Sequence, residues 1–154
     1  MTVWEQEEVR EIAELIKGID ICMFVTRADD RMEGRPMSNN GAVEFDGDNW
    51  FFSARESRKL ESIADDPQVE LAYIATDRGT WVSIEGPAEV VEDDARKREL
   101  WQEELQAWFR GGPDDDDVVL IKVNAERVHA WTQEGELVIE PGKGVARIPQ
   151  ATPV

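Results

Sequence analysis

Two cations and two hydroxyl side chains gather at one predicted junction between a strand and a helix. The aromatic-rich segment Trp50–Ala54 predicts a buried strand, and a short helix follows it. A phosphate monoester binds where helix N-terminal amides, a hydroxyl, a guanidinium and an ammonium group converge. Ser53, Ser57, Arg58 and Lys59 supply this set. The alternative is an ordinary capped helix with a solvated arginine and lysine, and the spacing alone does not decide between the two.

The positive charge at this junction contrasts with the rest of the chain. The protein has 34 acidic and 17 basic residues and a formal net charge of -17, yet Arg55, Arg58 and Lys59 fall within five positions of one another. A bound anion would explain this local reversal. The overall charge argues against nucleic acid as a partner, because each phosphate contact would work against a repulsive field.

Other kinds of chemistry find less support. Cys22 and His129 are the only cysteine and the only histidine, so a metal centre built from these residue types and an internal disulfide are excluded. The glycine-flanked serine of a hydrolase nucleophile elbow is also absent. We interpret acidic residues 92–94 and 114–117 as solvated surface. An acidic metal cluster is the alternative, but the spacing of a calcium loop is missing, and no metal site is predicted.

Length and hydropathy indicate one globular domain outside the membrane. A chain of 154 residues can bury a hydrophobic core without staples. The longest apolar run is far shorter than a bilayer span, and the N-terminal segment is charged and amphipathic, unlike a signal peptide. We expect a soluble cytoplasmic protein without a membrane partner.

Hydrophobic periodicity predicts a mainly β protein with flanking helices. Helices are expected over 3–17, in a short stretch after Ser57 that ends at Asp66-Pro67, and over 95–109. Strands are expected over 20–27, 35–45, 50–54, 69–75, 80–91, 118–124 and 127–132, with 35–45 and 50–54 forming a hairpin. Gly86-Pro87 predicts a bulge or a barrel corner. Six or seven strands suit a closed antiparallel barrel with helices packed outside.

Two features near the basic junction extend the hypothesis. Arg35-Pro36-Met37 lies on the strand expected to pair with Trp50–Ala54, so a second arginine could reach the same end of the sheet. Phe52 could offer a flat apolar wall for an aromatic ring system. A phosphate site beside an apolar slot describes a nucleotide-like ligand.

These motifs, in this order, resemble those of a known family. The chain is similar to the FMN-binding split barrels related to pyridoxamine 5'-phosphate oxidase, and within them to the small bacterial general stress proteins. The resemblance runs from about Val3 to Trp131. It rests on Gly34-Arg35-Pro36-Met37, Phe51-Phe52-Ser53, Ser57-Arg58-Lys59, the segment Trp81–Glu89, and the segments 100–109, 112–114 and 119–131.

The resemblance implies FMN as the cofactor, a six- to seven-stranded split barrel, and a homodimer with FMN at its interface. It assigns roles to residues of this chain: Arg35, Pro36, Met37 and Ser38 along the flavin, Phe52 and Ser53 packed on it or hydrogen-bonded to it, Arg58 and Lys59 on its phosphate, Trp81 where the oxidases carry a polar flavin contact, and Trp131 reaching the flavin from the second subunit.

The segment after Trp131 departs from the true oxidases. Their C-terminal arginine- and histidine-containing segment binds the pyridoxal substrate, whereas Gln133-Glu134-Gly135-Glu136 follows here without a histidine. Pyridoxamine-phosphate oxidation is therefore not supported. The expected function is a flavin reductase or stress-response redox protein with unidentified electron donor and acceptor and no assigned catalytic residue. The alternatives are a non-catalytic carrier of flavin or deazaflavin, and a structural dimer that has lost its cofactor.

The resemblance and the change in composition after Trp131 together predict how the chain is organised. Residues 1–132 are expected to form the flavin-binding split barrel. Residues 133–154 have a glycine- and proline-containing composition, with Leu137-Val138-Ile139 as a candidate short strand. We expect this tail to be loose or to clasp the partner subunit.

Overall fold

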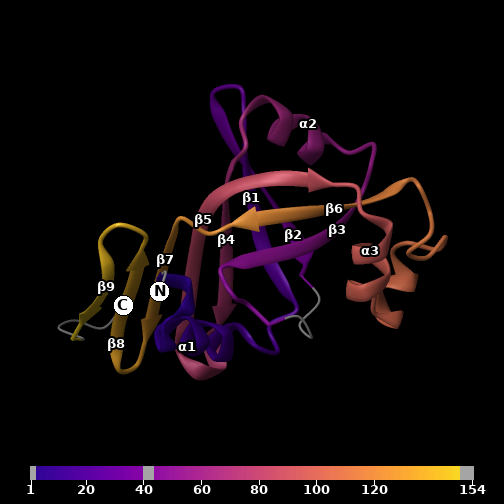
Figure 1. Ribbon diagram of the computed structural model, residues 1–154. Coiled ribbons are helices and arrows are strands. Elements are labelled where there is room, and N and C mark those ends of the chain that lie inside the picture. The colour runs from indigo at the N-terminus through magenta and orange to yellow at the C-terminus, as the bar shows by residue number, and fades with distance from the viewer. Residues whose placement is uncertain (1–2, 40–43, 150–154) are drawn as a thin grey trace.

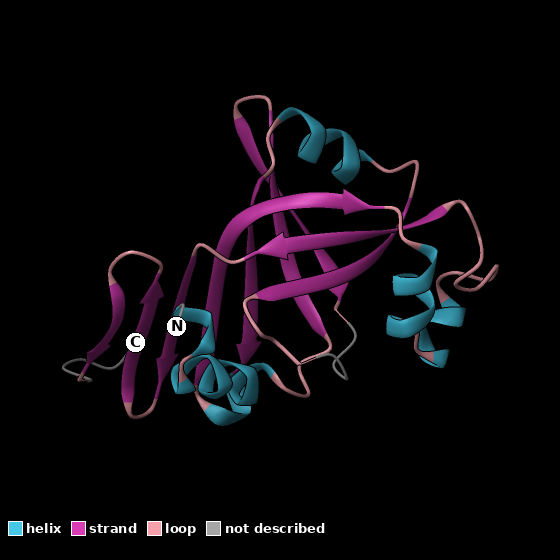
Figure 2. Ribbon diagram, in the orientation of Figure 1, coloured by secondary structure: helices cyan, strands magenta, loops and turns pink. Residues whose placement is uncertain are grey.

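The computed structural model describes residues 3–39 and 44–149, and it is mainly antiparallel β structure (Figures 1 and 2). The strands are β1 (Ile21–Ala28), β2 (Arg31–Ser38), β3 (Asp48–Ala54), β4 (Gln68–Ala75), β5 (Thr80–Val91), β6 (Val118–Asn124), β7 (Arg127–Thr132), β8 (Gly135–Glu140) and β9 (Gly144–Ile148). The helices are α1 (Glu7–Ile16), α2 (Arg58–Asp65) and α3 (Asp94–Leu100), and short 3-10 turns are η1 (Val3–Glu5), η2 (Thr76–Arg78) and η3 (Glu103–Ala107).

The sheet is a split barrel and not a closed one. Its strand order is β2-β1-β4-β5-β7-β8-β9, and β6 extends it by pairing with β5 on one side and β3 on the other. The expected antiparallel split-barrel class is therefore confirmed. Two details were wrong, because the described residues form nine strands instead of six or seven and the sheet does not close into a ring.

The expected hairpin between residues 35–45 and 50–54 is also wrong. β2 pairs along its whole length with β1, whereas β3 pairs with β6. The true hairpin turns at Asp29-Asp30, which lie in the gap between the predicted strands 20–27 and 35–45. Asp29 adopts φ 58, a left-handed conformation that aspartate tolerates and that two-residue hairpin turns require.

Gly86 marks the corner that the sequence predicted. Up to Pro87, β5 pairs with β4, and from Ala88 to Val91 it pairs with β6. Figure 1 shows the strong bend of this strand. A Cβ atom at position 86 would lie 1.9 Å from the carbonyl oxygen of Asn124, so the crossing backbone leaves room only for glycine.

The main core lies between the sheet and helix α1. The helix buries Val9, Ile12, Ala13 and Ile16, the positions that the sequence periodicity predicted.

Inside the barrel, the amide nitrogens of Asn39 and Asn49 donate to the Tyr73 hydroxyl at 2.6 and 3.0 Å. Burial raises the pKa of the nearby Cys22 thiol to about 12, so it remains a protonated core residue at neutral pH.

Two expected helices are shorter than the sequence suggested. Residues 3–17 split into η1 and α1 because Gln6 is extended. The sequence Thr2-Val3-Trp4-Glu5 matches a capping box for the predicted helix, but Thr2 lies outside the described residues. Residues 95–109 split into α3 and η3 because the backbone of Trp101 is extended, with ψ 136. The indole of Trp101 packs edge-on against Phe52, with ring centroids 5.3 Å apart. Tertiary packing thus overrides the helical pattern of this segment.

The segment after Trp131 is not loose in its described part. Gly135–Glu140 forms β8, which pairs with β7, and Gly144–Ile148 forms β9 beside it. Buried Leu137 and Ile139 tie β8 to the core, and this apolar alternation explains the order. Residues 150–154 lie outside the described residues, and the proposed clasp on a second subunit stays a prediction.

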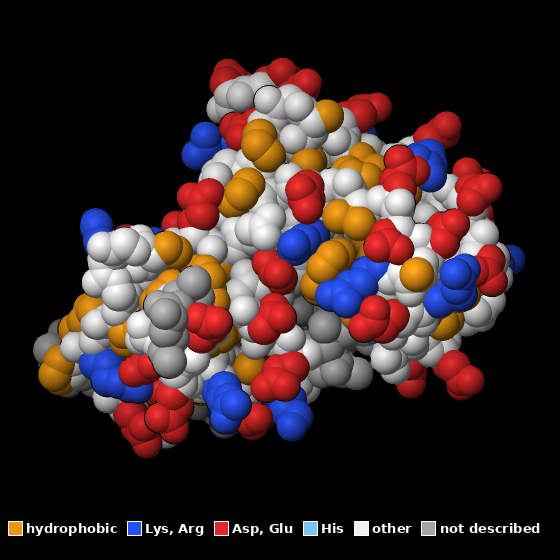
Figure 3. Space-filling view, in the orientation of Figure 1, with side chains coloured by type: hydrophobic (Ala, Val, Ile, Leu, Met, Phe, Trp, Pro, Cys, Tyr) orange, Lys and Arg blue, Asp and Glu red, His pale blue; other side chains and the backbone are white. Residues whose placement is uncertain are grey.

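Among the described residues, no helix combines the length and the apolar composition needed to cross a membrane. Acidic side chains cover much of the face in Figure 3, interspersed with cations. This distribution fits the interpretation of the negative charge as solvated surface.

Candidate functional site

The basic junction of the sequence lies where β3 leads into α2. Ser57 is the residue before the helix and has an extended backbone, but its hydroxyl makes no capping hydrogen bond. This hydroxyl lies 3.4 Å from that of Ser53, which is buried and donates to the Ala54 carbonyl at 3.0 Å. The two serines therefore come together at the start of α2, and the side chain of Ser57 is not committed to capping the helix.

Three arginines meet one carboxylate beside this helix start. The guanidinium of Arg58 forms an ion pair with Glu33 on β2. The Nη2 atoms of Arg31 and Arg35 each lie 3.9 Å from an oxygen of the same carboxylate. The expectation that Arg35 would reach the end of the sheet near Arg58 is thus confirmed, although through β2 and its partner β1 instead of a β2–β3 hairpin.

Arg35 is the rigid member of this group. Its Nη1 donates to the Phe24 carbonyl at 3.2 Å and to the Thr26 hydroxyl at 3.0 Å, and its side chain is 20% exposed. Burial lowers the pKa of Arg35. The pKa of the half-buried Lys59 is lowered by burial and then by the positive charge of Arg35. The positive charges of Arg35 and Lys59 therefore lie close enough to act on each other, and this arrangement favours binding of an anion.

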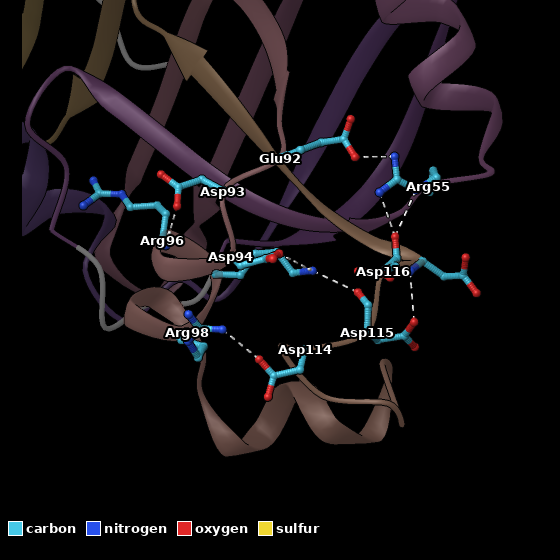
Figure 4. Close-up of polar contacts among 11 residues, drawn as sticks. Arg55, Glu92, Asp93, Asp94, Arg96, Arg98, Asp114, Asp115 and Asp116 are labelled. Atoms are coloured by element: carbon cyan, nitrogen blue, oxygen red, sulfur yellow. Dashed lines mark hydrogen bonds and ion pairs between the residues drawn. The ribbon is translucent and has the colours of Figure 1, made fainter.

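Arg55, the third cation of the junction, has a structural role. Its Nε and Nη2 donate to the Asp116 carbonyl at 2.9 and 2.8 Å, and its guanidinium also pairs with Glu92 (Figure 4). The buried Lys97 donates to the Asp115 carbonyl at 2.9 Å. These bonds tie the backbone of segment 114–117 to the end of β3 and to α3. Among the described residues, no group of three potential ligands is placed to hold a metal ion.

Phe52 does not provide an open apolar wall. It is 5% exposed and packs with Trp101, Phe109, Leu105 and Leu120 in a second hydrophobic cluster under α3. Because side chains alternate along a strand, Ser53 faces the opposite side from Phe52. The hydroxyl and the ring of the predicted site thus lie on different faces of β3.

The remaining β2 residues also divide between environments. Pro36 is exposed and lies opposite Met23 in the register of β1 and β2. Met37 packs against the main core, and the Ser38 hydroxyl donates to Asp20 Oδ1 at 2.5 Å. Of these β2 residues, Arg35 is the one linked to α2, because it shares the Glu33 carboxylate with Arg58.

Trp81 and Trp131 form a cross-strand pair on the outer face of the sheet. Trp131 stacks on His129 with ring centroids 3.7 Å apart, and the Nε2 atom of His129 lies 2.7 Å from Glu136 Oε1. Sequence patterns did not indicate this stack. Within the described residues, no hydrogen bond, ion pair or ring contact joins Trp81 or Trp131 to the cations of α2, so one chain presents two separate parts of the predicted site.

Sequence reasoning also missed Glu33. Its position two residues before Arg35 on the same strand places both side chains on one face, and this alternation was the available signal. The pattern was hidden because the predicted strands, 20–27 and 35–45, left residues 28–34 outside any strand.

An opened antiparallel barrel, with a helix that begins beside Arg58 and Lys59, defines a split-barrel protein. The chain belongs to the pyridoxamine 5'-phosphate oxidase like family, whose model matches residues 7–148.

Comparisons with individual proteins agree with this assignment. The chain is 26% identical over 135 residues to protein bli-3 of Neurospora crassa, covering 80% of this chain and 64% of that protein. It therefore spans less than two thirds of this relative.

Solved structures show the same fold. A general stress protein 26-related protein of Clostridium acetobutylicum is 18% identical, with a TM-score of 0.74 over 86% of this chain and 93% of that one. General stress protein 26 of Bacillus anthracis is 22% identical, with a TM-score of 0.72 over 93% and 100%. A general stress FMN/FAD binding protein of Xanthomonas citri is 23% identical, with a TM-score of 0.71 over 84% and 92%.

Proposed function

We propose that this chain is an FMN-binding oxidoreductase-like protein that acts as a flavin reductase or stress-response redox protein. The observation that carries the proposal is that Arg35 and Arg58 share the Glu33 carboxylate and that the charge of Arg35 acts on Lys59, at the helix start where the Ser53 and Ser57 hydroxyls meet. This donor set fits a phosphate monoester, since guanidinium, ammonium and hydroxyl groups can all donate to its oxygens. Membership in the family and the FMN/FAD binding named for the Xanthomonas citri protein support a flavin as the ligand. Among flavins we propose FMN, because its phosphate is the monoester that this donor set fits.

In this proposal, the residues of the chain bind and orient the cofactor. Arg35, Arg58 and Lys59 hold the phosphate, Ser57 offers its hydroxyl to it, and the buried Ser53 lies beside Ser57. The bound isoalloxazine supplies the electron transfer, so a protein acid or base is not required for the chemistry. The absence of a catalytic signature in the sequence agrees with this division of roles.

The proposal includes a homodimer that completes the flavin site. Exposed apolar side chains occupy the outer sheet face near Trp81 and Trp131, including Met23 at 38%, Ile74 at 52% and Ile148 at 44% exposure. Ile74 lies directly opposite Trp81 in the register of β4 and β5. A second copy packed on this face would bury these residues and bring its Trp131 to the flavin of the first.

We expect the purified protein to sediment as a dimer of about 35 kDa, twice the 17.5 kDa chain mass. Ile74→Glu should yield a monomer, because it places a charge in the proposed apolar interface. Trp108→Glu is the matched control: Trp108 is 75% exposed but follows η3, away from this face, so its variant should remain dimeric. A monomeric wild-type protein, or a dimeric Ile74→Glu variant, would contradict the proposed interface.

Anaerobic mixing with a nicotinamide donor tests the redox role. We expect the visible absorption of the bound flavin to bleach, because reduction removes the oxidised isoalloxazine. The measurement is stopped-flow absorbance of the FMN-loaded protein, with free FMN as the control. Tight binding without faster bleaching than free FMN would instead identify a carrier.

A further inference from the structure

The carboxylate of Glu33 occupies the proposed phosphate site. It lies on β2 beside the start of α2, and its side chain is 22% exposed. One oxygen pairs with Arg58, and the other lies 3.9 Å from the guanidinium groups of Arg31 and Arg35. An acidic side chain thus already makes the type of contact expected of an anionic ligand.

The contacts of Glu33 differ in how easily they can be exchanged. Arg35 is anchored by the Phe24 carbonyl and the Thr26 hydroxyl, so it stays in place whatever its counter-ion. Arg58 is 74% exposed, and an ion pair at such a site adds little to stability. A guanidinium N–H that donates to a carboxylate cannot make the same bond to a phosphate. The Arg58–Glu33 pair is therefore the contact that an incoming phosphate would replace.

We propose that Glu33 is an internal counter-ion that holds Arg58 in the unliganded protein and is displaced from it by the phosphate group of the ligand. This inference rests on the proposed function, and it names Glu33 as the residue that weakens the affinity of the protein for FMN. Glu33 neutralises the arginines in the absence of ligand, and it opposes every ligand with a phosphate dianion. A flavin without a phosphate, riboflavin, does not compete with it.

The test compares FMN and riboflavin binding to wild type and Glu33→Gln, measured by fluorescence titration. The glutamine variant should bind FMN about fivefold more tightly, the size of one partly exposed ion pair, with riboflavin affinity unchanged. Glu11→Gln is the matched control, since it makes the same substitution and removes the ion pair of Glu11 with Arg147 on a distant surface. It should leave both affinities unchanged.

A second background isolates the contact. In Arg58→Gln protein, the added Glu33→Gln change should tighten FMN by less than twofold, because the group that Glu33 holds is already gone. Circular dichroism verifies folding of each variant. If glutamine prevents folding, Glu33→Thr, a residue suited to a strand, replaces it.

The outcomes separate this inference from the proposed function. Tighter FMN binding that depends on Arg58 supports the counter-ion role. Wild-type protein that binds FMN, with no gain in Glu33→Gln, overturns the inference and leaves the function intact. Equal gains for FMN and riboflavin also overturn it, because the effect would not involve the phosphate. Failure of all variants to bind FMN overturns both.

Discussion

Replacing Lys59 with methionine is expected to weaken FMN binding by about 1.5–3 kcal/mol, or about 10- to 150-fold. The substitution keeps most of the apolar stem and removes the ammonium group that would contact the phosphate. Isothermal titration at fixed salt measures the change. Lys17→Met is the control, because Lys17 lies at the end of α1 and its side chain is 70% exposed. Unchanged affinity in Lys59→Met would remove this residue from the site.

The same variant should be more stable than wild type in the absence of ligand. Burial and the positive charge of Arg35 lower the pKa of Lys59 in the folded protein. At a pH below this lowered pKa, Lys59 is charged in the folded protein, and its charge reduces the free energy of unfolding. As pH rises from that value toward the ordinary 10.5, the folded protein loses the proton first, and wild-type stability rises. Methionine removes the penalty, so its melting temperature should exceed that of wild type by about 2 °C at neutral pH. A lower melting temperature would contradict this reading.

Gly86→Ala is expected to destabilise the fold by about 3 kcal/mol or more, which would lower the melting temperature by about 6–12 °C. The added Cβ would lie 1.9 Å from the Asn124 carbonyl oxygen, and this contact is with backbone that no rotamer change relieves. Thermal unfolding followed by circular dichroism measures the effect.

Gly34→Ala is the control for this prediction. Its added Cβ would meet the flexible end of Met23 at 3.3 Å, so the neighbour can move aside. We expect a change below about 1 kcal/mol. Equal effects of the two substitutions would mean that the strand crossing at Gly86 is not the source of the cost.

The elements that are determined by residues close together in the sequence were predicted correctly. The apolar spacing of Val9, Ile12 and Ile16 located α1, and Gly86-Pro87 located the corner of β5. The hairpin at Asp29-Asp30 was missed because aspartate, unlike glycine, gives only a weak signal for a left-handed turn residue. The partner of β3 depended on contacts with β6, about 70 residues later in the chain, which periodicity cannot supply.

The candidate site was predicted in part for the same reasons. Serine, arginine and lysine at a strand-to-helix junction were visible as residue types, and Arg35 was correctly expected nearby. The burial of Phe52 under Trp101 could not be predicted from the sequence, because it depends on which face of β3 is covered by α3 and the residues after it. Glu33 could be found only once β2 was known to begin at Arg31.

The visible absorption spectrum of the purified protein, with FMN titration, tests the central claim most directly. We expect a flavin spectrum, release of fluorescent FMN on denaturation at about one per chain, and a higher melting temperature when FMN is added to protein stripped of flavin. Colourless protein that releases no flavin and whose melting temperature does not respond to FMN would contradict the claim.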